Sequence, residues 1–232
     1  MHLGGTKQKT VLAALLMADG RVVSDDRLSH VLWRDRPPKT AEAQIYTYIS
    51  RLRKLLDEHV SISRQGHGYA MSIRGAIFDW AEFTRLSRMG RDAFADGRFR
   101  QASKQLSEAL SLYKGGALTG TTEFLQSEAA TGLEEARMVA LEGRIEAHIA
   151  LGRYADLVPE LLNVVTSHPF RERVRAQLMF VLHRCGRQSD AIGVYHEGRQ
   201  MLAEELGVDP GPMMSEVYQG ILTGQPLLRC AA

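Results

Sequence analysis

Residues Thr40–Leu56, TAEAQIYTYISRLRKLL, decide the fold of the first third of the chain. Apolar residues recur here at the spacing of a helix with about 3.6 residues per turn, at Ile45, Ile49, Leu52 and Leu56. The opposite face carries small and hydroxylated residues first and cations last, namely Thr40, Ala43, Thr47, Ser50, Arg51 and Lys54. This order predicts a helix whose first half enters a nucleic-acid groove while its last turns meet phosphates. The alternative interpretation is an ordinary amphipathic helix with a solvated basic end.

The composition limits the class of protein. The 232 residues allow one large domain or two small ones, and 44% hydrophobic with 24% charged residues is typical of a folded globular chain. The two cysteines, Cys185 and Cys230, provide neither a disulfide framework nor a metal-ligand spacing, as expected in a reducing cytoplasm. No apolar run approaches the roughly 18 residues of a membrane span, and the N-terminus lacks the apolar core of a signal peptide. A cytoplasmic protein without a membrane partner is therefore expected.

The net charge of +2 hides an asymmetry along the chain. Residues 1–76 contain 12 Lys and Arg against 7 Asp and Glu, a net charge of +5. The remaining residues contain 17 against 20, a net charge of −3. A basic module joined to a mildly acidic one favours nucleic-acid binding with an attached partner module.

Two further helices are predicted before Thr40. The segment Thr6–Ala18 is strongly apolar after Val11 and is closed by a glycine, which predicts a helix. Lys7 lies in its first turn, where a cation is either present by chance or available to a phosphate. Ser24 is a good N-cap for the second helix, SDDRLSHVLW.

The predicted elements on either side of Thr40–Leu56 complete the first module. Two prolines in RDRPPK cannot continue a helix, so Arg34–Lys39 is predicted to be a stiff exposed loop. After Leu56, SISRQGHGYAMSI alternates around two glycines, which predicts a hairpin with Arg64, His67 and Tyr69 at its tip. Helix, helix, loop, helix and hairpin is the order of a winged helix-turn-helix.

The remainder of the chain is predicted to be helical and repetitive. Three of the Gly-Arg dipeptides begin at positions 97, 152 and 186, and the second and third of these are 34 residues apart. This separation matches the tetratricopeptide period and predicts stacked helical hairpins. The stretch around Tyr113–Gly132 is predicted to hold a loop before a long helix at Glu123–Ala150, and Pro210 and Pro212 are predicted to precede a capping helix.

Catalytic and metal-binding motifs are not recognisable. GGTKQKT lacks the spacing of a phosphate-binding loop, and HEG at His196 lacks the second histidine of a zinc motif. His67 has no second ligand spaced to join it, and no nucleophile is grouped with a base. The sequence therefore predicts a protein that is not an enzyme and has no cofactor and no metal.

Both modules resemble known domains. LGGTKQKTVLAALLMADGRVVSDDRLSHVLW, PPKTAEAQIYTYISRLRKLL and GHGYAM resemble the DNA-binding domain of the Streptomyces antibiotic regulatory protein family, itself similar to the C-terminal domain of OmpR/PhoB-type response regulators. EEARMVALEGRIEAHIALGRYADLVPELLNVV, HPFRERVRAQLMFVLHRCGRQSDAI and EELGVDPGP are similar to the bacterial transcriptional activation domain that follows it. Longer members of this family add an ATPase module, and this chain resembles a small member.

One departure from the family concerns the start of the chain. Members normally begin with a small antiparallel sheet ahead of the LGG segment, but only two residues precede it here. Either the start is truncated or misassigned, or this member lacks the sheet. Without it, one face of the first helix is expected to lack its usual cover, which would lower the stability of the domain.

The resemblance implies a mainly α protein. A winged helix-turn-helix of three helices and a β-hairpin wing is expected at 1–76, an all-α tetratricopeptide-like activation domain at 77–225, and a tail at 226–232. The implied function is activation of a secondary-metabolite (antibiotic) gene cluster, with the helix 40–56 in the major groove of promoter repeats. A helical-repeat scaffold or ligand-sensing protein with a degraded DNA-binding domain is the alternative.

The implied partners are double-stranded promoter DNA and RNA polymerase, through its sigma factor and other subunits, with homodimer formation left open. In this family the loop before the third helix contacts RNA polymerase, which here points to Arg34, Asp35 and Arg36. Tyr48 is as well explained by packing, and Arg53 by solvation or an ion pair. The predicted DNA-binding residues are Lys7, Thr40, Gln44, Thr47, Tyr48, Arg51, Arg53, Lys54, Arg64, His67 and Tyr69.

Overall fold

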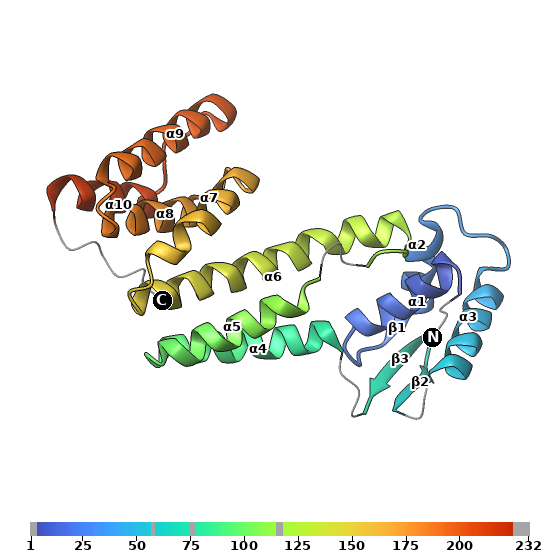
Figure 1. Cartoon of the computed structure of the whole chain (residues 1–232). Helices are drawn as coiled ribbons and strands as arrows, with labels where there is room; N and C mark the ends of the chain where they lie inside the picture. The colour runs from blue at the N-terminus through green and yellow to red at the C-terminus, as the bar shows by residue number, and fades with distance from the viewer. Residues whose placement is uncertain (1–3, 57–58, 75–77, 115–117, 225–232) are drawn as a thin grey trace. The chain divides into compact units, whose positions relative to one another are not determined.

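The structure, a computed structural model, describes residues 4–56, 59–74, 78–114 and 118–224. The chain divides into two compact units (Figure 1). The first unit comprises Met1–Arg85 with Ala109–Met138, and the second comprises Leu86–Glu108 with Val139–Ala232. The expected fold class is confirmed, since helices and a small antiparallel sheet at the N-terminus are followed by helices throughout the rest of the described chain.

Three helices and a hairpin form the expected winged helix-turn-helix in the first unit (Figure 1). Helix α1 is Thr6–Met17, α2 is Asp25–Trp33 and α3 is Ala41–Leu55. Ser24 caps α2 as predicted, because its hydroxyl accepts a hydrogen bond from the Arg27 amide at 3.1 Å. Thr40 occupies the N-cap position of α3, but its side chain makes no capping hydrogen bond.

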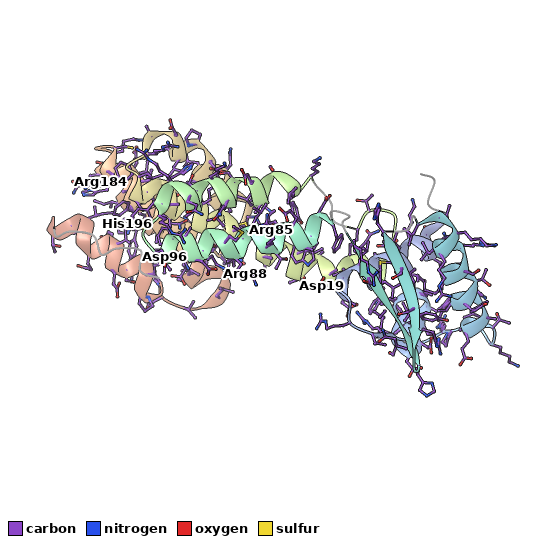
Figure 2. All side chains as sticks on the ribbon, turned by 90° about the horizontal axis from the view of Figure 1, so that it is seen from below. Asp19, Arg85, Arg88, Asp96, Arg184 and His196 are labelled. Carbon is purple, nitrogen blue, oxygen red and sulfur yellow. The ribbon has the colours of Figure 1, made fainter. Side chains whose placement is uncertain are left out.

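A short first strand makes the hairpin part of a three-stranded sheet. Strands β2 (Val60–Gln65) and β3 (Gly68–Ile73) pair antiparallel and form the long hairpin seen in Figure 2. Strand β1 (Val23–Ser24) pairs with the other edge of β3, so the strand order is β1-β3-β2. An added Cβ at Gly68 would lie 2.4 Å from the Val23 carbonyl oxygen, so only glycine allows this close pairing.

The core of the first unit joins these helices to the sheet. The apolar stripe predicted for α3 is buried at Ile45, Ile49 and Leu52, as expected from its spacing. Leu125, which lies far along the chain, is buried in the same core. Within α1 the side chains from Lys7 to Met17 are buried or half-buried.

Three helices contribute residues to both units. Helix α4 is Asp79–Ala95, α5 is Phe99–Leu112 and α6 is Glu123–Ala150, the last with the predicted bounds. Arg85 and Arg88, labelled in Figure 2, lie on α4 on either side of the division between the units. The short 3-10 helix η1 (Ala155–Leu157) and helices α7 (Val158–Ser167), α8 (Glu172–Arg184), α9 (Gln188–Leu206) and α10 (Pro212–Thr223) complete the second unit.

The Gly-Arg dipeptides that begin at 97, 152 and 186 are the turns of helical hairpins, as their spacing predicted. Gly97, Gly152 and Gly186 have φ values of 73°, 74° and 75° and lie two residues after the ends of α4, α6 and α8. Each arginine amide then donates to the carbonyl five residues earlier, for example Arg187 to Leu182 at 2.9 Å. Glycine is required there because other residues rarely adopt the left-handed conformation.

Two buried carboxylates lie inside the second unit. The side chains of Glu142 and Glu146 are 7% and 6% exposed. Glu142 accepts from Arg171 at 2.5 Å, and Glu146 accepts from Arg173 at 2.6 Å and from Gln177 at 3.3 Å. Burial raises the pKa of Glu146, while Arg173 lowers it. The two arginines therefore link the start of α8 to the second half of α6.

Among the helices that the structure describes, none is long and apolar enough to cross a bilayer.

Candidate nucleic-acid interface

The outward face of α3 presents two exposed cations. Thr47, Arg51 and Lys54 are all exposed on it. Thr47 satisfies its own hydroxyl by donating to the Ala43 carbonyl at 2.8 Å. Within the described residues, no ion pair or hydrogen bond occupies the charged groups of Arg51 and Lys54. Both lie toward the C-terminal end of α3, where the helix dipole favours positive charge.

A chain of polar side chains fixes the first half of the same helix. Gln44 donates through Nε2 to Thr40 Oγ1 at 3.0 Å, and Tyr48 Oη donates to Gln44 Oε1 at 3.4 Å. Tyr48 is half-buried and packs against the core, so the packing interpretation of this residue has a structural basis. Gln44 keeps one amide hydrogen and one lone pair for another partner, because its amide has two of each.

Arg53 and Arg64 are engaged within the first unit. Arg53 donates through Nε to the Ile62 carbonyl at 2.9 Å and so ties α3 to strand β2. Arg64 forms two parallel hydrogen bonds to Asp25, at 2.8 and 2.7 Å, and its guanidinium lies 4.7 Å from the centre of the Tyr69 ring. The bond to Asp25 raises the pKa of Arg64 above its ordinary value. A phosphate that binds Arg64 must compete with this carboxylate.

The hairpin pattern predicted Tyr69 at the tip of the wing, but the residue does not lie at an exposed tip. It is 4% exposed because β3 is the central strand and Arg64 covers the face of its ring. His67, by contrast, is exposed at the turn, and its carbonyl accepts from the Asp25 amide at 2.9 Å. The wing therefore presents His67 and the outer part of Arg64 to solvent.

A recess of about 560 Å³ separates the start of α3 from the wing. Glu42, Tyr46 and His67 are among the residues that line it. Tyr46 is 61% exposed and was not selected from the sequence. Tyr46 lies one turn before Ser50 and two turns before Arg53, so the three residues share one side of α3. This spacing could have identified Tyr46 as part of the candidate interface.

The remaining predicted residues lie near the C-terminal end of α2. The Lys7 ammonium is 4.8 Å from the centre of the Trp33 ring, so this cation already has an aromatic partner. Arg34, Asp35 and Arg36 are exposed in the loop between α2 and α3, as expected.

Among the described residues, no group of three or more His, Cys, Asp or Glu side chains is placed to hold a metal ion.

Comparisons with known proteins assign both parts of the chain. Residues 78–222 match the family described as bacterial transcriptional activator domain, and residues 3–71 match the family described as transcriptional regulatory protein, C terminal. The chain is 38% identical to the regulatory protein AfsR of Streptomyces coelicolor over 97% of its own length and 23% of AfsR. It is 32% identical to the regulatory protein DnrI of Streptomyces peucetius, over 95% of this chain and 85% of DnrI.

Mycobacterial relatives give the same assignment. The transcriptional regulatory protein EmbR of Mycobacterium tuberculosis is 39% identical over 97% of this chain and 59% of EmbR. A solved structure of EmbR in complex with a low affinity phosphopeptide superposes with a TM-score of 0.93 at 37% identity, covering 99% of this chain and 62% of that one. The chain thus spans about a quarter of AfsR and three fifths of EmbR. It belongs to the Streptomyces antibiotic regulatory protein family of transcriptional regulators with a winged helix-turn-helix DNA-binding domain.

Proposed function

We propose that this regulator activates a secondary-metabolite (antibiotic) gene cluster by binding promoter repeats with α3 in the major groove and recruiting RNA polymerase. The observation that carries the proposal is the outward face of α3, where Arg51 and Lys54 are exposed and have no acidic partner among the described residues. A helix that only covered a core would more often carry paired charges on that face. The protein would then act in the bacterial cytoplasm.

The contacts follow from the chemistry of each side chain. Gln44 can pair bidentately with adenine and Arg51 with guanine, while Thr47 and Tyr46 line the groove beside them. Lys54, Arg53, Arg64 and Lys7 are assigned to phosphates, and His67 to the tip of the wing. Thr40 and Tyr48 orient Gln44 through the hydrogen bonds described above.

The proposed contact with RNA polymerase uses the loop between α2 and α3. Arg34, Asp35 and Arg36 are exposed there, and Pro37 and Pro38 stiffen the chain that follows. The helices of the second unit are proposed to contribute dimerisation or further activator contacts.

Fluorescence anisotropy on labelled promoter DNA, measured across salt concentrations, tests DNA recognition directly. We expect binding that weakens linearly in log–log form as salt increases and that distinguishes the operator from unrelated duplex. Binding that is weak, insensitive to salt and blind to sequence would instead favour a helical-repeat scaffold or ligand-sensing protein.

Arg51→Ala is expected to cost on the order of 1–3 kcal/mol of operator affinity and to relax the sequence preference at one position. The reason is loss of a bidentate contact to a base edge. The measurement is the ratio of the dissociation constants for operator and unrelated DNA. Arg184→Ala, in the second unit, removes the same charge and serves as the control. Unchanged affinity and preference in Arg51→Ala would contradict the proposed orientation of α3.

Lys54→Ala is expected to weaken binding to all sequences about equally and to reduce the slope of log K against log salt by about one. An ammonium that neutralises a phosphate releases a counterion but carries no sequence information. The same anisotropy titration measures both quantities. A loss of preference without a change in slope would show that Lys54 contacts a base.

A further inference from the structure

The start of helix α6, although part of the activator domain, is bonded to the DNA-binding domain within the first unit (Figure 1). The Thr122 amide donates to Thr10 Oγ1 at 2.8 Å, and the Thr122 hydroxyl donates to the Val31 carbonyl at 2.8 Å. Leu125 is buried in the winged-helix core. Arg27 and Glu128 form an ion pair at 2.6 Å. These contacts hold the first two turns of α6 against α1 and α2.

Phe124 is the residue of this segment that reaches the polymerase-contact loop. Its ring meets that of His30 edge-on, with 4.9 Å between the ring centres and an angle of 87° between the ring planes. The guanidinium of Arg34 lies over the same ring, 4.7 Å from its centre. One aromatic ring thus contacts both the last turn of α2 and the first residue after it.

The backbone at Arg34 needs such support. Arg34 has φ 57° and ψ −124°, a conformation that residues other than glycine adopt only at a cost in free energy. Its amide donates to the His30 carbonyl at 2.8 Å, so the strained residue is fixed to the same turn that packs on Phe124. A strained residue keeps its conformation only where surrounding contacts hold it.

Helix α3 is fixed by other contacts. Ile45, Ile49 and Leu52 are buried in the core, and Arg53 is bonded to the Ile62 carbonyl. Phe124 therefore supports the loop between α2 and α3, and it does not support the DNA-contacting face of α3.

We propose that Phe124 is a positioning residue, through which the activator domain holds Arg34 and the loop Arg34–Arg36 in the conformation that engages RNA polymerase. This inference rests on the proposed function of that loop. If Phe124 has this role, the level of transcription depends on the contact between Phe124 and Arg34. A measurement of DNA affinity does not detect this contact. A partner that displaced the start of α6 would release the loop.

The test compares Phe124→Leu with the wild-type full-length chain. Leucine keeps most of the apolar packing but removes the aromatic face for Arg34 and His30. Phe124→Tyr restores that face, and Phe170→Leu, at an exposed phenylalanine of the second unit, is the matched control. Thermal unfolding followed by circular dichroism establishes that each variant is folded.

The first readout is the rate of trypsin cleavage after Arg34 and Lys39, the cleavable positions of the loop. We expect Phe124→Leu to raise this rate by about tenfold, while Phe124→Tyr and Phe170→Leu stay near wild type. An unchanged rate in Phe124→Leu would overturn the proposal whether or not the protein activates transcription.

The second readout separates promoter binding from activation. With purified RNA polymerase, Phe124→Leu is expected to reduce activated transcription by about tenfold while its promoter affinity stays within about twofold. Equal losses of affinity and transcription would show a merely structural role and overturn the proposal. If cleavage rises as expected but Arg34→Ala activates normally, the polymerase assignment of the loop fails, and the positioning by Phe124 stands.

Discussion

Replacing Ile49 by alanine is expected to lower the free energy of unfolding of the first unit by about 2–5 kcal/mol. Ile49 is fully buried, and it lies in the centre of the apolar stripe with which α3 packs on the core. The loss combines the transfer free energy of the deleted methyl and methylene groups with the cost of the cavity left behind. Because a domain is stable by only about 5–15 kcal/mol, promoter binding should fall with the folded population.

Urea denaturation followed by tryptophan fluorescence measures this effect selectively. The chain has two tryptophans, Trp33 and Trp80, and both lie in the first unit. Leu55→Ala is the control, since Leu55 is on the same helix but 38% exposed. Its expected cost is within about 0.5 kcal/mol. Equal midpoints for the two variants would mean that α3 does not bury the face described here.

Local patterns predicted the elements of the fold because each was encoded within a few turns. The stripe of α3, the cap at Ser24 and the Gly-Arg turns depend on residues less than ten positions apart. The bounds of α6 were predicted correctly from the Gly- and Thr-rich stretch before it. In each case the periodicity or the turn chemistry is sufficient to predict the element, because the main competing structures do not fit the same local pattern.

Contacts between distant segments could not be predicted in this way. Thr122 bonds to Thr10 and Val31 across 112 and 91 positions, and no local pattern marks such partners. The expectation that α1 lacks its usual cover rested on the family's first sheet, and it did not include the start of α6, where the Thr122 amide bonds to Thr10 of α1. The burial of Tyr69 was missed for a related reason: an isolated hairpin alternates, but the added strand β1 makes β3 central.

The candidate interface shows the same division. The periodicity of α3 placed Arg51 and Lys54 on the exposed face, as the structure has them. The pairing of Arg64 with Asp25 spans 39 positions and was not foreseen. A local pattern can thus predict that a charged side chain is exposed, but it cannot predict whether that side chain has an ionic partner.

Arg173→Ala is expected to destabilise the second unit by about 3 kcal/mol at neutral pH, the low end of the range for a broken buried pair. Arg173 is 40% exposed, but its partner Glu146 is almost fully buried and would lose its cation. Gln177 remains as a donor to Glu146, at 3.3 Å, and supplies no charge. The carboxylate of Glu142 lies close by and adds repulsion.

The cost is expected to depend on pH with a definite sign. Burial raises the pKa of Glu146 in the folded state above its value in the unfolded chain. The protonated carboxyl therefore contributes its whole stabilisation below the unfolded-state pKa. This contribution is lost as the pH rises through the folded-state pKa. Removing Arg173, which lowers the pKa of Glu146, raises that pKa further. Arg173→Ala should therefore cost most at about pH 7.5 and clearly less at about pH 5.

Urea denaturation at both pH values, followed by circular dichroism and in parallel by tryptophan fluorescence, tests this expectation. The dichroism should report the loss, while the tryptophans of the first unit should change little. Arg187→Ala is the matched control, because Arg187 and Asp190 form an ion pair in which both side chains are 50% exposed. Its cost is expected to be at most about 1 kcal/mol. If Arg173→Ala cost no more than this control, or the same at both pH values, Arg173 would not be what neutralises the buried carboxylate of Glu146.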